Sequence, residues 1–181
     1  LIAAVCMPDR NTMFSGLWQI LSQPAKISTN YFAVGGYAAT FLNMGLVGLC
    51  CLGLYVLCGA TPNNVSTLAF VLTLGFCSWG INILNIWPTV LGVVLYCLVK
   101  KEKLGANVNA MLFSTGIAPL ISDLLVRHPY PDVVGFNLYG FVVAMIVGIA
   151  IGFFLPAGLT HSPKVHKGFD LYSAAVPVCL F

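Results

Sequence analysis

Charged side chains are scarce in this chain of 181 residues. Asp, Glu, Lys and Arg make up 7% of it, whereas an ordinary soluble domain has roughly 25%. No charged residue occurs between Lys26 and Lys100, or between Asp132 and Lys164. A soluble domain needs ionised side chains over its surface, and apolar runs beyond about 18 residues are typical of membrane-spanning helices. The scarcity of charge therefore excludes a soluble globular domain and predicts an integral membrane protein, with the lipid bilayer as its first partner.

The familiar patterns of catalysis and metal binding are also missing. The seven cysteines form no C-x-x-C pair, and the three histidines share no ligand-like spacing. No G-x-S-x-G, H-E-x-x-H or phosphate-binding loop occurs. The net charge of +3 resides in short connecting segments, which argues against binding to nucleic acid. We therefore expect no enzyme, no metal and no cofactor.

The apolar runs that remain predict an all-α, polytopic bundle of transmembrane helices. The whole of 1–181 is expected to be one integral-membrane region, and because the sequence starts without Met and stops in an apolar run, we expect it to be a fragment of a longer protein. Apolar residues at helical spacing around Trp18 predict a short helix lying at the membrane surface. The expected elements are this interfacial helix at 12–22, spans at about 31–58, 65–99, 104–125 and 133–155, and the start of a further membrane segment at 168–181.

The run at 65–99 is longer than the ~20 residues of one span, yet too short for two spans and a turn. Pro88 lacks a backbone N–H and clashes with the preceding turn, so a helix kinks or stops there. We expect either one spanning helix broken near Pro88, or one span followed by a half-helix that does not cross.

Orientation follows from the basic residues, which are enriched in cytoplasmic loops. If the chain crosses four times, only Arg127 lies on one side of the membrane. The other side then carries Arg10, Lys26, Lys100, Lys101, Lys103, Lys164 and Lys167. This bias predicts that the basic loops are cytoplasmic and supports a single net crossing for 65–99.

Three prolines interrupt apolar stretches, each near amides or hydroxyls: Pro88, Pro119 and Pro177. Free backbone groups in hydrocarbon cost several kcal/mol, so such breaks persist only where protein or a water-filled cavity satisfies them. Transporters and channels build midplane sites from broken or re-entrant helices of this kind. The alternative is an ordinary proline kink satisfied by neighbouring Ser and Thr side chains.

One polar-tipped phrase occurs twice, as GFNLY at 135–139 and GFDLY at 168–172. With four crossings the two copies stand at opposite faces, as in folds built from inverted repeats. The alternative is that both are capped helix starts with aromatic side chains at the membrane interface. Together with the broken regions they complete a set of candidate pathway-lining residues: Asn82, Asn85, Pro88, Ser114, Thr115, Pro119, Asn137, Tyr139, Asp170 and Tyr172.

Two further patterns concern helix faces. Asp123 and Arg127 stand four residues apart near the end of a span, where they form either a coupling site or a structural ion pair. Ala144, Gly148 and Gly152 form a small-x-x-x-small series that lets a second helix approach closely. That partner is another helix of the chain or a second subunit, the latter giving a homo-oligomer.

The stretches NYFAVGGYAATFLNMGLVGL, NIWPTVLGVVLYCLVKKEKLGANVNAMLFSTGIAPLISDLLVRHP and HKGFDLYSAAVPV resemble a bacterial family of multi-pass membrane proteins known as a domain of unknown function. The resemblance covers most of 12–181 and implies an all-helical fold, a bacterial inner-membrane setting and a C-terminal half of similar length. It implies no substrate. Short Gly–aromatic–Asn phrases that open half-helices are also similar to those of the urea-transporter fold, which has two inverted halves around a pore.

The sequence favours a channel or secondary transporter for a small polar solute, because uncharged amides and hydroxyls predominate at the breaks. A scaffold or assembly subunit, whose polar residues only join helices, is the alternative. A hydrated cavity that reaches Asn85 and Pro119 favours transport. Amides bonded from helix to helix in a dry bundle favour the scaffold.

Overall fold

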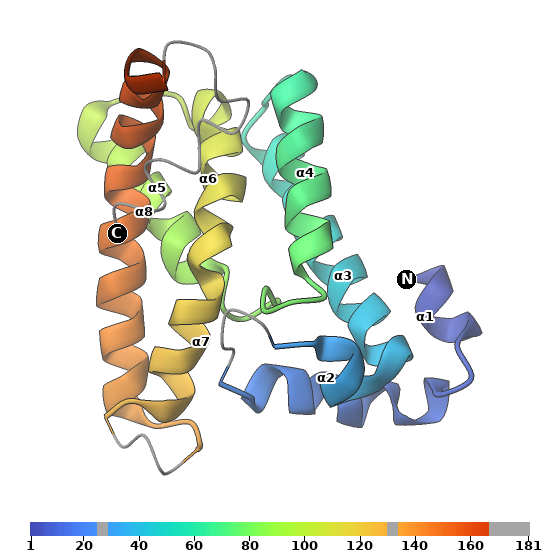
Figure 1. The fold of residues 1–181 in the computed structure, drawn as a ribbon. Coiled ribbons are helices and arrows are strands. Elements are labelled where there is room, and N and C mark those ends of the chain that lie inside the picture. The colour runs from blue at the N-terminus through green and yellow to red at the C-terminus, as the bar shows by residue number, and fades with distance from the viewer. Residues whose placement is uncertain (25–28, 130–133, 167–181) are drawn as a thin grey trace.

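The computed structural model describes residues 1–24, 29–129 and 134–166, and every regular element within these ranges is a helix (Figure 1). The chain begins with α1 (Ile2–Cys6), a 3₁₀ turn at Arg10–Thr12 and α2 (Met13–Ser22). In Figure 1, α2 lies across one end of the bundle, at a large angle to the long helices. It coincides with the helix predicted at 12–22. Phe14 and Trp18 of α2 are exposed, as expected of a helix at a membrane surface.

Helix α3 (Tyr31–Leu57) is the first long apolar helix, and it is interrupted at Gly36. The φ angle of Gly36 is 84°, a conformation that favours glycine because a Cβ would be strained there. The backbone N–H of Ala38, just after the interruption, donates to both carboxylate oxygens of Asp9 at 3.2 Å. Asp9 thus caps the straight part of α3, where its negative charge also complements the helix dipole.

The next apolar run forms two half-helices, α4 (Asn64–Phe76) and α5 (Trp87–Lys100), joined by a non-helical turn at 77–86. At ~1.5 Å per residue each half-helix is roughly 20 Å long, less than the ~30 Å hydrocarbon core. The two halves lie at the same end of the bundle (Figure 1). A Cβ added to Gly105, after α5, would lie 2.6 Å from the carbonyl oxygen of Cys58, before α4. The segment 64–100 is therefore a helical hairpin whose two ends lie together, which is the shape of a re-entrant hairpin.

This hairpin differs from the net crossing that the sequence analysis expected for 65–99. Pro88 stands in the first turn of α5, as its missing N–H favours, but the break begins eleven residues earlier along the chain, at Cys77. The chain turns back there because side chains from distant helices satisfy the turn. The four-crossing topology and its seven-to-one division of basic residues therefore do not hold for this structure.

The rest of the described chain forms two columns. The first runs through a 3₁₀ turn (Leu104–Asn107), α6 (Val108–Ser114), a second 3₁₀ turn (Thr115–Ile117) and α7 (Ala118–Arg127). The second is α8 (Leu138–His166). The segments long and apolar enough to cross a membrane are Tyr31–Leu57, Leu104–Arg127 and Leu138–His161. The described chain is thus an all-α membrane protein with three candidate spans and one re-entrant hairpin.

Helices α5 and α8 pack through glycines. A Cβ on Gly152 would collide with the carbonyl oxygen of Thr89, and one on Gly92 would collide with that of Ile149. Gly148 meets Pro88 in the same way. The small-residue face predicted on α8, with Ala144 2% exposed, is therefore covered by α5 of the same chain. The helix that packs on this face is therefore another helix of the chain and not a second subunit.

We predict that Gly152→Ala lowers the stability of the protein, because the added methyl group forces α5 and α8 apart, and overpacking of this kind costs about 1–3 kcal/mol. The measurement is the thermal unfolding midpoint of the full-length protein in detergent. Gly53→Ala in α3 is the matched control, since a Cβ at Gly53 has no neighbour within 4 Å. Equal midpoints for the two variants would contradict the close approach of α5 and α8.

Candidate functional site

The non-helical turn at 77–86 is stabilised first by its own asparagines. The Asn82 Oδ1 atom accepts hydrogen bonds from the backbone N–H groups of Leu84 and Asn85, both at 3.0 Å. Asn85 Oδ1 accepts from the N–H of Asn82 at 2.8 Å, and Asn85 Nδ2 donates to the carbonyl oxygen of Gly80 at 2.7 Å. Each amide thus replaces partners that the backbone lacks where the helix is broken.

A third asparagine reaches the turn from α3. Asn43 Nδ2 donates to the carbonyl oxygens of Cys77 (3.2 Å) and Ile81 (2.9 Å), while its Oδ1 accepts from the N–H of Ile83 at 3.2 Å. One side chain therefore satisfies three backbone groups of the turn. Asn43 is fully buried. It is the one amide in the stretch TFLNMGL, and an amide in an apolar run was the sequence signal that could have identified it.

Two more side chains join the turn to the rest of the bundle. Ser122 Oγ in α7 accepts from Asn85 Nδ2 at 2.8 Å and from Asn82 Nδ2 at 3.5 Å. The Tyr31 hydroxyl accepts from Asn82 Nδ2 at 3.2 Å, and the Tyr31 N–H donates to the carbonyl oxygen of Ser78 at 3.0 Å. We refer to Asn43, Asn82, Asn85, Ser122 and Tyr31 together as the asparagine cluster.

The asparagine cluster is buried. Asn43, Asn85 and Tyr31 have no exposed surface, and Asn82 and Ser122 are 1% and 2% exposed. The amide groups of Asn82 and Asn85 bond to the backbone of the turn and to Ser122 of α7, and that of Asn82 also bonds to Tyr31 of α3. The structure places these two predicted residues together, but in an internal hydrogen-bond network rather than along an open path.

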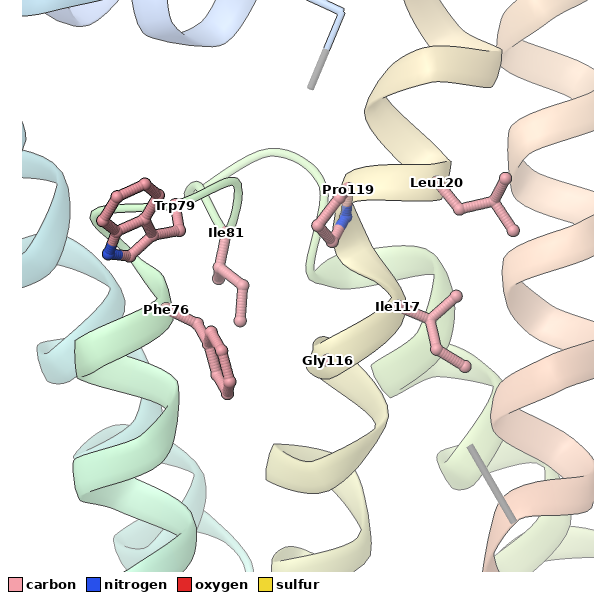
Figure 2. Close-up of a pocket in the computed structure, with 7 residues that line it drawn as sticks. All are labelled: Phe76, Trp79, Ile81, Gly116, Ile117, Pro119 and Leu120. Atoms are coloured by element: carbon pink, nitrogen blue, oxygen red, sulfur yellow. The ribbon is translucent and has the colours of Figure 1, made fainter. Parts of the chain in front are cut away.

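An open space does lie beside the cluster. A cavity of about 250 Å³ separates the tip of the hairpin from the break between α6 and α7. Figure 2 shows Phe76, Trp79 and Ile81 on the hairpin side, opposite the segment from Gly116 to Leu120, with Pro119 facing the gap. Pro119 is thus a predicted residue that does line a cavity. The lining contains no charged side chain.

Pro88, a second of the three predicted prolines, borders a different cavity, and Pro177 lies outside the described residues. Pro88 borders a second cavity of about 290 Å³, together with Leu84, Trp87 and residues of α7 and α8. This space is also lined by apolar side chains. The re-entrant turn is therefore flanked by two apolar cavities, with the asparagine cluster between them.

The predicted hydroxyls at the end of α6 and the start of the following 3₁₀ turn donate to carbonyl oxygens three residues earlier in α6. Ser114 Oγ donates to the carbonyl oxygen of Met111 at 2.7 Å, and Thr115 Oγ1 donates to that of Leu112 at 2.6 Å. Both residues are buried. Thr115 borders a small cavity of about 50 Å³ next to the larger one, whereas Ser114 lines none of the cavities described here. Their hydrogen bonds are those of an ordinary break in a membrane helix.

The first copy of the repeated phrase forms a helix cap. Asn137 precedes α8, accepts from the N–H of Gly140 at 2.6 Å and donates to the carbonyl oxygen of His128 at 2.8 Å. Tyr139 is exposed and stacks on His128 with ring centroids 5.3 Å apart. GFNLY thus has the structure of the capped, aromatic helix start. Asp170 and Tyr172 of the second copy lie outside the described residues.

Asp123 and Arg127 form a loose ion pair at the end of α7. The Asp123 Oδ1 and Arg127 Nε atoms are 3.8 Å apart, and the two side chains are 40% and 28% exposed. Neither atom makes a hydrogen bond. The pair borders neither of the cavities beside the turn, which is the arrangement of a structural pair at the end of a span.

The sequence profile of one protein family, described as "Protein of unknown function (DUF1576)", matches residues 9–176. The chain belongs to this family. No curated protein and no solved structure matches the chain. The bacterial setting and the similarity to the urea-transporter fold therefore stay predictions.

We predict that Ser122→Ala destabilises the protein by about 1–3 kcal/mol, because the buried amides of Asn82 and Asn85 each lose one of their two acceptors. Ser114→Ala is the control, since this buried hydroxyl bonds only within its own column. The measurement is the unfolding midpoint of each variant in detergent. An unchanged midpoint for Ser122→Ala would show that the cluster does not hold the turn.

Proposed function

We propose that this member of the family forms part of a channel or secondary transporter for a small, neutral polar solute. The proposed path runs through the cavity between the hairpin tip and the break in the column α6–α7. The observation that carries the proposal is this juxtaposition: two interruptions of helix, far apart in sequence, face each other across an open space.

Interrupted helices support a transport role for an energetic reason. Each unsatisfied backbone group in hydrocarbon costs several kcal/mol, so the hairpin needs the asparagine cluster in order to exist. A protein that only spans the membrane avoids this requirement with continuous helices. Transport proteins use re-entrant and broken helices to place polar backbone near the middle of the membrane.

The lining of the cavity supports a small and uncharged solute. Binding pockets for drug-sized molecules have volumes of roughly 300–1,000 Å³, and the cavity at the hairpin tip has about 250 Å³. Phe76, Trp79 and Ile81 offer apolar and aromatic surface with no ionised group to replace the hydration shell of an ion. A metal cation would favour charged oxygen ligands, and none lines this space.

In this proposal the asparagine cluster has a structural role and does not bind the solute. It fixes one wall of the cavity, because Asn82 and Asn85 hold the turn while Ser122 holds α7 at its back. The solute then meets Trp79 and Pro119 rather than the amides themselves. The resemblance to a bacterial family of longer proteins supports an inner-membrane setting and a C-terminal half that completes the path.

A scaffold or assembly subunit is the second candidate. It is favoured by the burial of Asn82 and Asn85, whose amides bond within the bundle as those of a helix-joining network do. The two functions differ in what the cavity beside Pro119 does. In the scaffold it is a packing site for another protein segment, and in the transporter it carries solute.

We predict that Gly116→Leu abolishes solute flux and leaves folding intact. Gly116 lies on the cavity wall and a Cβ there has no neighbour within 4 Å, so the leucine side chain fills open space. The measurement is stopped-flow light scattering from vesicles that contain the full-length protein, with urea, formamide and glycerol as probes. The expected result is at least a tenfold slower equilibration of a conducted probe.

Gly53→Leu is the matched control, because Gly53 in α3 also has open space around its Cα and lies away from the cavity. It should conduct as the unmodified protein does. Flux through Gly116→Leu at the normal rate would remove the cavity from the path. Equal permeability of empty and protein-containing vesicles to all three probes would favour the scaffold.

A further inference from the structure

The re-entrant hairpin decides where the lysines of the KKEK segment lie. Lys100 ends α5, and Lys101 and Lys103 follow in the connection to α6. Because α5 returns to the end of the bundle from which α4 started, these lysines share that end with Cys58 and Gly59. The last turns of α8, which contain Lys164, reach the same end (Figure 1).

Glu102, the acidic residue of this segment, offsets one of its three positive charges and forms an ion pair with none of the lysines. Glu102 Oε2 accepts from Asn107 Nδ2 at 2.9 Å, and Oε1 accepts from the Tyr96 hydroxyl at 3.4 Å. Within the part of the chain that the structure describes, the only ion pair is that of Asp123 with Arg127. Lys100, Lys101 and Lys103 are exposed.

The opposite end of the bundle is balanced. Its described basic residues are Arg10 and Arg127, and each has an acid beside it, Asp9 and Asp123. Lys26 and Asp132 belong to connections outside the described residues. The described charges thus give one end of the bundle a surplus of positive charge, and the other end none.

We infer that the end with Lys100, Lys101 and Lys103 faces the cytoplasm and binds the anionic headgroups of that leaflet. Basic residues near the ends of spans set orientation, and juxtamembrane lysines are attracted to anionic lipids. Helices α1 and α2 then lie on the outer side. This reverses the side predicted from sequence for Arg10 and retains it for the KKEK lysines. The inference is independent of the proposed transport function.

Orientation can be tested by cysteine labelling of the full-length protein in intact bacterial cells. Single cysteines replace the exposed residues Asn11, Thr61 and Lys103, one at a time, in a full-length background from which all other cysteines have been removed, and a membrane-impermeant maleimide is the probe. We expect Asn11→Cys to be labelled in intact cells, and Thr61→Cys and Lys103→Cys only after permeabilisation. The reverse pattern would overturn the orientation. Different sides for Thr61→Cys and Lys103→Cys would overturn the hairpin that underlies it.

Headgroup binding can be tested by the shift of the unfolding midpoint when lipid is added to the protein in detergent. Phosphatidylglycerol should raise the midpoint more than phosphatidylcholine does. Changing all three lysines to glutamine should weaken this effect on the order of 100-fold in lipid concentration, from about fivefold per lysine. Arg10→Gln, at the other end, should leave it unchanged.

Three results would overturn the assignment to lipid headgroups. The first is an equal response of the unmodified protein to both lipids. The second is a response to phosphatidylglycerol that survives the triple substitution. The third is an equal shift with inorganic phosphate at the same concentration, which would identify a site for free anions rather than for the membrane surface.

Discussion

The structure depends on the hydrogen bonds that three asparagines make inside a hydrophobic bundle. A turn at 77–86 leaves backbone N–H and C=O groups that no helix satisfies, and hydrocarbon offers them no partner. Asn43, Asn82 and Asn85 supply those partners within the chain, with Ser122 and Tyr31 as their own partners in turn. The return of the hairpin, the space at its tip and the position of the KKEK lysines all follow from this network.

Much of the fold could be predicted because the signals for it are local. Long apolar runs predicted the helices that became α3, the column Leu104–Arg127 and α8, since a run of sufficient length needs no distant partner to be recognised. Pro88 marked the start of α5 for an equally local reason. The hairpin could not be predicted in this way. Its stability comes from Asn43 and Ser122, which stand some 40 residues away in sequence on either side.

In the candidate site, too, local features could be predicted from the sequence and contacts between distant residues could not. Asn82 and Asn85 were recognised as unusual, because amides in an apolar run need partners, but sequence alone does not tell a hydrogen-bond network from a polar path. Pro119, which was predicted from its position in an interrupted apolar run, lines the cavity at the hairpin tip. Trp79 and Gly116 carry no signal, since each resembles the apolar residues around it. The small-residue face of α8 was recognisable, yet only the structure shows that α5 occupies it.

The number of basic residues on each side of the membrane depends on the topology that is assumed. Lys100, Lys101 and Lys103 are the same residues in either topology, but a crossing and a hairpin assign Arg10 and Lys26 to different sides relative to them. An uneven distribution of basic residues that is obtained by assuming one topology therefore does not independently support that topology. The burial of polar groups is the stronger constraint, because each unsatisfied group costs several kcal/mol, whereas a surface lysine contributes about 1 kcal/mol.

The central claim is that 64–100 enters the membrane and returns to the same side. A distance between spin labels at Thr61 and Lys103, measured by pulsed electron paramagnetic resonance on the full-length protein in a lipid bilayer, tests it most directly. The account predicts a separation well below the ~30 Å thickness of the hydrocarbon core, because the connections before α4 and after α5 are in contact. A separation equal to or above that thickness would mean that the segment crosses, and would contradict the hairpin.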